Sequence, residues 1–137
     1  MARPPAVHLN GGMVGDSSLV SPELIEHFQN PRNVGELPPP AVTVEVSNPV
    51  CGDILRLSAL INGGYITQCG FKVRGCTASI AAGSVLTELI AGRDKKSLKD
   101  LTAGDIEYAV GGLSNESKHA AALCLDAVRA LLTQFPV

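Results

Sequence analysis

The chain has 137 residues, of which 45% are hydrophobic and 18% are charged, a length and composition typical of one globular domain. The net charge of −2, without any run of Lys or Arg and with only 4% aromatic residues, argues against nucleic-acid binding and against binding to an anionic membrane. No apolar run reaches the length of a membrane span and the N-terminus lacks the apolar centre of a signal peptide, so we expect a cytoplasmic protein.

The first part of the chain predicts a mobile arm followed by a short helix. Residues 1–19 contain Gly, Pro, Ser and Asn without periodicity, which predicts an arm before a single domain at residues 20–137. The stretch SPELIEHF places Ser21 as an N-cap, with Pro and Glu in the first turn. Leu24 and Phe28 fall on one face of this helix. An Asn-Pro pair should end it, because the residue before proline disfavours the α conformation.

Three consecutive stretches are predicted to form β-strands. Residues 42–46 alternate between apolar and polar side chains, and residues 53–61 and 65–73 alternate in part. The sequence INGGY between the last two stretches is typical of a tight hairpin turn. Three strands in succession predict an antiparallel meander.

The remainder of the chain is predicted to be helical. A long helix is expected over residues 77–92 with Gly92 as its C-cap, short helices around SLKDL and AGDIEYAV, and a last helix from about residue 115 to residue 134. Strands followed by helices indicate an α+β fold. Its three-stranded antiparallel sheet should pack against helices on one face.

A cytoplasmic chain keeps its thiols reduced, so its cysteines are available for metal binding. Some of the four cysteines stand in patterns that favour this use. In CGD, Cys51 and Asp53 lie two residues apart and share one face of a strand. Cys76 follows a glycine at the start of the long helix, where the positive end of the helix dipole favours the thiolate. A buried structural role is the alternative for each, and Cys69, in mid-strand, is assigned to the core. Sulfur combined with carboxylate oxygen suits zinc or a labile iron site.

Four segments occur in order along the chain: HFQNPRNVG (27–35), NPVCGD (48–53), GCTASIAAGSVLTELIAG (75–92) and SKHAAALCLDAVRALL (117–132). Together they resemble the U-type iron–sulfur cluster assembly scaffold family, which includes IscU and the N-terminal domain of NifU. The resemblance implies an α+β fold with a three-stranded antiparallel sheet. It also implies a protein that receives sulfide from a cysteine desulfurase, gathers iron, builds a [2Fe–2S] cluster and passes the cluster to recipient proteins.

The resemblance assigns site residues position by position. Cys51, Asp53 and Cys76 match the first cysteine, the aspartate and the second cysteine of the family pattern. The family then has a His-Cys pair at the start of its last helix, where this chain has His119 and Ala120. The third cluster cysteine is therefore missing from its usual position. Cys51, Asp53, Cys76 and His119 remain as the expected set of ligands, and such a set would also satisfy a tetrahedral zinc ion.

Cys124 is the one thiol that could replace the missing ligand. Positions 120 and 124 share a helix face about 6 Å apart, whereas His119 and Cys124 differ by about 140° around the axis. Cys124 also belongs to the apolar stripe of the last helix. Two interpretations stay open: a core thiol, which we favour for the resting state, and a displaced metal ligand used during assembly.

The expected partners are a cysteine desulfurase and recipient apo-proteins of iron–sulfur clusters. The family's chaperone-recognition segment reads LSNES here, at residues 113–117, without the family's prolines and lysine. This difference argues against recognition by the dedicated Hsp70-type chaperone. The leading hypothesis is a scaffold or carrier rather than an enzyme. The alternatives are a zinc-bound sulfur acceptor and a desulfurase-binding domain that no longer builds clusters.

Overall fold

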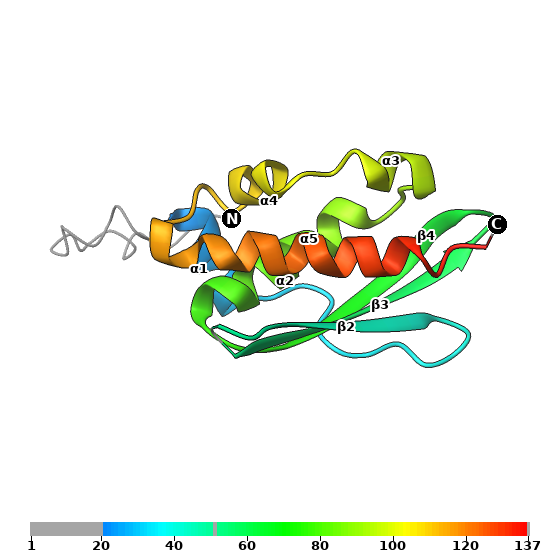
Figure 1. Cartoon of the computed structure of the whole chain (residues 1–137), viewed down its shortest axis with the longest axis horizontal. Coiled ribbons are helices and arrows are strands. Elements are labelled where there is room, and N and C mark those ends of the chain that lie inside the picture. Colours follow the sequence, from blue (N-terminus) through cyan, green and yellow to red (C-terminus); the bar gives the residue numbers. More distant parts are fainter. Residues whose placement is uncertain (1–20, 51, 137) are drawn as a thin grey trace, which may run out of the picture.

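The computed structural model describes residues 21–50 and 52–136, so the arm expected at residues 1–19 lies outside the described residues. Within these residues one short helix precedes the strands, and the remaining helices follow them (Figure 1). In chain order the elements are α1 (Pro22–Gln29), β2 (Val42–Asn48), β3 (Asp53–Asn62), β4 (Tyr65–Arg74), α2 (Thr77–Ile90), α3 (Lys95–Lys99), α4 (Ala103–Ala109), the 3₁₀ turn η3 (Asn115–Ser117) and α5 (Lys118–Leu132).

The three strands form one antiparallel sheet in the order β2-β3-β4, as the sequence predicted. The turn between β3 and β4 contains Gly63 and Gly64, whose φ angles are 61° and 85°. Tight two-residue hairpin turns of this kind require positive φ at both central residues, which glycine adopts without steric cost. Leu57 in the central strand pairs with Val44 on one side and with Phe71 on the other, so these side chains share one face of the sheet.

The helices cover that face of the sheet. Helix α5 packs against β2 and β3, α2 packs against β4, and Figure 1 shows both helices on the same side of the strands. The core between the layers contains Leu57, Leu86 and Leu131, each of which is fully buried. This arrangement confirms the predicted α+β class, in which helices pack on one face of a three-stranded sheet.

Helix α1 corrects one expectation from the sequence. Ser21 caps the helix by accepting a hydrogen bond from the backbone N–H of Leu24, as predicted, and Leu24 is buried. Phe28, expected on the same face, is instead 41% exposed, and His27 is buried in its place. The reason is a polar partner on α2, because His27 Nδ1 lies 2.7 Å from Ser84 Oγ. A buried imidazole with a hydrogen bond costs much less than an unpaired one, so the helix can turn this side inward.

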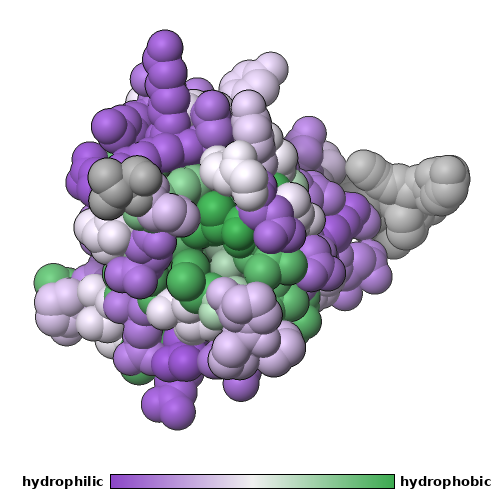
Figure 2. Space-filling view, turned by 90° about the vertical axis from the view of Figure 1, so that its right-hand side faces the viewer, coloured by the Kyte–Doolittle hydropathy of each residue, from purple (hydrophilic) through white to green (hydrophobic). Residues whose placement is uncertain are grey.

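The two ends of the molecule differ in character. Helices α2 and α5 and strand β3 all begin at one end, whereas the hairpin between β3 and β4 and the last turn of α5 lie at the other (Figure 1). Figure 2 shows that apolar residues gather at the centre of this second end and are surrounded by polar ones.

Among the described residues, no helix has the length and hydropathy needed to cross a bilayer.

Candidate metal site

Three side chains from three different elements meet at the end where these elements begin. Asp53 is the first residue of β3, Cys76 is the N-cap of α2 and His119 lies in the first turn of α5. One ligand atom of each lies within 4.8 Å of the others. The structure therefore brings together three of the four residues that we expected to form the site. The fourth, Cys51, lies outside the described residues.

The connection between β4 and α2 allows the carboxylate of Asp53 to approach the backbone closely. A Cβ atom added at Gly75 would lie 2.6 Å from Asp53 Cγ and 2.9 Å from each carboxylate oxygen. Only glycine leaves room for Asp53, whose residue surface is 6% exposed. Cys76 follows in an extended conformation and makes no side-chain capping bond, so its thiol is available to the site rather than to the helix.

The distances between the three donor atoms match those of a tetrahedral metal site. Cys76 Sγ lies 3.6 Å from His119 Nε2 and 3.7 Å from Asp53 Oδ2. His119 Nε2 lies 3.4 Å from Asp53 Oδ2. Typical zinc–ligand bond lengths combined with tetrahedral angles give separations of about 3.6, 3.6 and 3.4 Å for the same three pairs. The three atoms therefore stand at positions from which they could bind one ion with little movement.

The orientation of the His119 ring strengthens this interpretation. His119 Nδ1 lies 2.9 Å from the backbone carbonyl oxygen of Glu116. A carbonyl oxygen only accepts, so Nδ1 carries a proton, and Nε2 is the ring nitrogen through which His119 would bind a metal. Nε2 faces Asp53 Oδ2 and Cys76 Sγ. The carbonyl oxygen of Glu116 therefore orients the ring in the way that the outer hydrogen-bond partner of a metal-bound histidine does.

Ser79 is a fourth polar residue at the site, and it was absent from the set expected from the sequence. Its hydroxyl is 2.5 Å from Asp53 Oδ2 and 3.4 Å from Cys76 Sγ, and the residue is 2% exposed. The sequence does contain a signal for it. A serine three residues after the N-cap cysteine lies in the same helical turn and faces the same side.

The other two described thiols are in the core. Burial raises the pKa of Cys124 to about 12 and that of Cys69 to about 11, and Cys69 Sγ donates a hydrogen bond to the carbonyl oxygen of Thr87. Both thiols therefore stay protonated, the form that binds metals poorly. Ala120 is also fully buried, so the position of the missing family cysteine does not open to solvent. Among the described residues, the converging donor group includes Asp53 and not Cys124.

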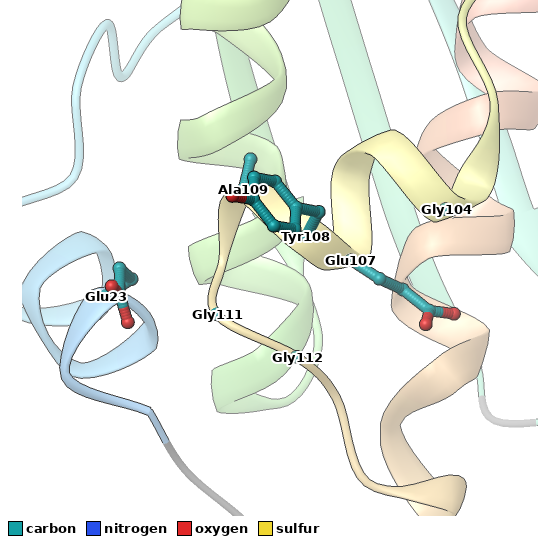
Figure 3. Close-up of a pocket in the computed structure, with 7 residues that line it drawn as sticks. All are labelled: Glu23, Gly104, Glu107, Tyr108, Ala109, Gly111 and Gly112. Atoms are coloured by element: carbon teal, nitrogen blue, oxygen red, sulfur yellow. The ribbon is translucent and has the colours of Figure 1, made fainter.

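A separate hollow of about 640 Å³ lies between α1 and α4 (Figure 3). It offers two carboxylates, but Figure 3 shows the side chain of Glu107 pointing away from Glu23. Glu107 instead forms an ion pair with Lys118 at 3.0 Å. The hollow lacks the convergence of donors that the first site has. Its lining residues are Glu23, Gly104, Glu107, Tyr108, Ala109, Gly111 and Gly112.

Comparisons with known proteins agree with this fold. The model of the NifU-like N terminal domain family matches residues 19–137. The chain is 40% identical over 109 residues to the bifunctional protein NifU/MnmA of Rubrobacter xylanophilus, covering 78% of this chain and 22% of that protein. It is 32% identical over 117 residues to the iron–sulfur cluster assembly scaffold protein IscU 1 of Archaeoglobus fulgidus, covering 85% of this chain and 76% of that one.

A solved structure supports the fold independently. It is that of a candidate iron–sulfur cluster assembly scaffold protein for the SUF system from Fervidobacterium islandicum, with a TM-score of 0.67. The sequence identity is 20%, and the match covers 86% of this chain and 99% of the other. Because the family model spans residues 19–137 and the Archaeoglobus relative is 32% identical over 76% of its own length, the chain belongs to the family of the NifU-like N terminal domain.

Proposed function

We propose that this chain is an iron–sulfur cluster assembly scaffold. It accepts sulfide from a cysteine desulfurase, gathers iron and passes a [2Fe–2S] cluster to recipient apo-proteins. It holds and transfers a cargo rather than turning over a substrate as an enzyme does. The names of its relatives support this role, and we assign the role to residues 20–137 as a single domain. The chemistry needs reduced thiols, which a reducing compartment such as the cytoplasm maintains.

The observation that carries the proposal is the convergence of three donor atoms at tetrahedral separations. In the proposed site Cys76 supplies a thiolate, His119 a neutral imidazole nitrogen and Asp53 a carboxylate oxygen, with Cys51 as the second thiolate. Thiolates bind iron strongly, whereas a carboxylate is a harder ligand that iron holds less tightly in the company of sulfur. A mixed set of this kind suits a cargo that must be bound and then released.

The alanine at position 120 sets a limit on how the cluster is held. Each iron of a [2Fe–2S] cluster needs two ligands besides the bridging sulfides, so the four proposed residues are just sufficient. Cys124 could join them only if the first turn of α5 rotated or unwound, since it is 1% exposed. We propose that Cys124 stays in the core in the resting protein. Its use as a third thiolate would be confined to assembly.

A zinc-bound sulfur acceptor is the second candidate. The specific observation in its favour is that the three donor separations fit a single ion of zinc size. In this alternative the ion orders the site and a thiolate receives sulfur from the desulfurase. We keep iron or a [2Fe–2S] cluster as the proposed cargo and assign zinc to the resting state. The segment LSNES at 113–117 argues against the Hsp70-type chaperone as a partner.

Anaerobic reconstitution tests the proposal. The protein is incubated with a cysteine desulfurase, cysteine, ferrous iron and a thiol reductant, and bound iron, sulfide and zinc are measured beside the visible spectrum. We expect Cys76→Ser to acquire neither iron nor sulfide. Equal uptake by wild type and Cys124→Ser would assign Cys124 to the core throughout, whereas lower uptake by Cys124→Ser would show that it serves as a third thiolate during assembly. Retained zinc with sulfur bound to the protein and no iron would favour the sulfur acceptor. Binding of the desulfurase without uptake of iron, zinc or sulfur would leave only an interaction domain.

A further inference from the structure

The hydroxyl of Ser79 contacts the one carboxylate oxygen on which the site converges. An ionised carboxylate only accepts hydrogen bonds, so Ser79 donates its single hydroxyl proton to Asp53 Oδ2, at 2.5 Å. The same oxygen lies 3.4 Å from His119 Nε2 and 3.7 Å from Cys76 Sγ. Asp53 Oδ2, rather than Oδ1, is therefore the oxygen that would face an ion at this site.

Two neighbours limit the orientation of this carboxylate. Gly75 lies on one side, where an added Cβ would come within 2.9 Å of both carboxylate oxygens. Ser79 supplies the hydrogen bond from the first turn of α2, and its hydroxyl is buried with 2% of the residue exposed. A carboxylate without such partners can rotate about its last bond and bind a metal through either oxygen or through both. With one lone pair of Oδ2 occupied by the hydroxyl proton, one lone pair of this oxygen remains for the ion.

We propose that Ser79 is a positioning residue that holds Asp53 ready to bind metal through Oδ2 alone. The hydroxyl fixes which oxygen points at the ion. Ser79 itself does not bind the metal in this arrangement. The inference rests on the proposed function only to the extent that an ion binds at Asp53, Cys76 and His119.

Metal titration of substituted proteins provides the test. Hydrogen-bond partners of metal ligands typically change metal affinity by about 10- to 100-fold when they are removed. We expect Ser79→Ala to lower the affinity for Zn²⁺ by a factor in this range, measured by competition with a chromophoric chelator. With Co²⁺ as the probe, the thiolate-to-metal absorption band should remain because Cys76 still binds. The ligand-field bands should shift because the carboxylate no longer has one fixed orientation.

Matched variants separate the effect of losing the Ser79 hydroxyl from the effect of a changed side-chain shape. The side chains introduced by Ser79→Thr and Ser79→Val have nearly the same shape, but only threonine keeps the hydroxyl. The Ser79→Thr protein should therefore bind Zn²⁺ at least 10-fold more tightly than the Ser79→Val protein. Ser84→Ala is the control on the same helix. Ser84 is fully buried and contacts His27 Nδ1 and the backbone N–H of Arg32, so its loss should affect stability and leave Zn²⁺ affinity unchanged.

The outcomes separate a failure of the role proposed for Ser79 from a failure of the proposed metal site. If wild type binds neither Zn²⁺ nor Co²⁺, the metal site is wrong and the role of Ser79 with it. If wild type binds and Ser79→Ala stays within twofold in affinity with an unchanged Co²⁺ spectrum, only the role of Ser79 is wrong. Equal affinities for the threonine and valine variants, both folded by circular dichroism, would also refute it.

Discussion

Replacing Gly75 with alanine should move the carboxylate of Asp53 and weaken metal binding. The new Cβ would stand 2.6 Å from Asp53 Cγ, whereas carbon atoms in contact are normally about 3.5 to 4.0 Å apart. The carboxylate must therefore shift by about 1 Å. Metal–ligand distances tolerate only about 0.2 Å, so the ligand would leave its productive position. The φ angle of Gly75 is outside the left-handed region, so the effect comes from this contact and not from backbone strain.

The magnitude follows from the size of that displacement. Overpacking of this kind typically costs about 1 to 3 kcal/mol of folding stability. Displacing a carboxylate ligand should lower Zn²⁺ affinity by about 10-fold or more, equivalent to about 1.4 kcal/mol. Both quantities are measurable on one sample, the first by urea denaturation of the metal-free protein and the second by chelator competition.

Gly104→Ala is the matched control. Gly104 lies in α4, and its nearest neighbour for an added Cβ is Thr102 Oγ1 at 3.6 Å, an ordinary contact. Alanine should raise stability there by about 0.5 to 1 kcal/mol through its better helix propensity and leave Zn²⁺ affinity unchanged. Wild-type Zn²⁺ affinity in Gly75→Ala would show that the position of Asp53 does not matter to the ion, and the site as described would be wrong.

Further predictions concern the thiols and one buried histidine. Iodoacetamide should label Cys76 well before Cys124 in the folded metal-free protein, because Cys124 is buried and its pKa is raised to about 12. Labelling of Cys124 before Cys76 would contradict its place in the core. Ala120→Cys should lengthen the lifetime of a reconstituted cluster against a chelator, since it restores a thiol beside His119, and an unchanged lifetime would show that position 120 does not reach the cargo. Burial, together with the charge of Arg32, lowers the pKa of His27 below 6.5 in the folded protein. As the pH falls, His27 therefore takes up a proton in the unfolded chain at a higher pH than in the folded one. Folding stability should therefore fall as the pH drops below 6.5, and His27→Gln should flatten this slope in urea denaturation.

The order and type of the secondary-structure elements were predictable because local signals marked their boundaries. The serine cap, the Gly-Gly hairpin and the alternation of the strands each have a short-range physical cause. The longer helices differ only at their ends: α2 ends at Ile90, with Ala91 as the C-cap and Gly92 following at a φ of 83°. The expected last helix starts as a 3₁₀ turn at Asn115–Ser117. Helix ends depend on tertiary contacts, which a local pattern does not contain.

The site was predictable in part. The residue types and the family pattern pointed to Asp53, Cys76 and His119, which the structure brings together. The role of Ser79 depends on the distance between two side chains that are 26 positions apart in the chain, which no spacing rule gives. The burial of His27 in place of Phe28 likewise depends on Ser84, a partner 57 positions away. Such pairings arise only when two elements pack.

All three donor side chains stand where an element begins, and this has a consequence for how the proposed cargo would leave. The first turn of a helix lacks the hydrogen bonds that hold its interior, so it opens at a small fraction of the free energy needed to unfold the whole domain. Lifting the first turn of α5 would carry His119 away from Cys76. The rest of the helix would stay packed on the sheet through its buried residues Leu123 and Leu131. A recipient that competes for one ligand at a time could thus empty the site while the core stays folded. Amide hydrogen exchange should then be fast at the start of α5 and slow beyond Leu123, with the cargo slowing only the former.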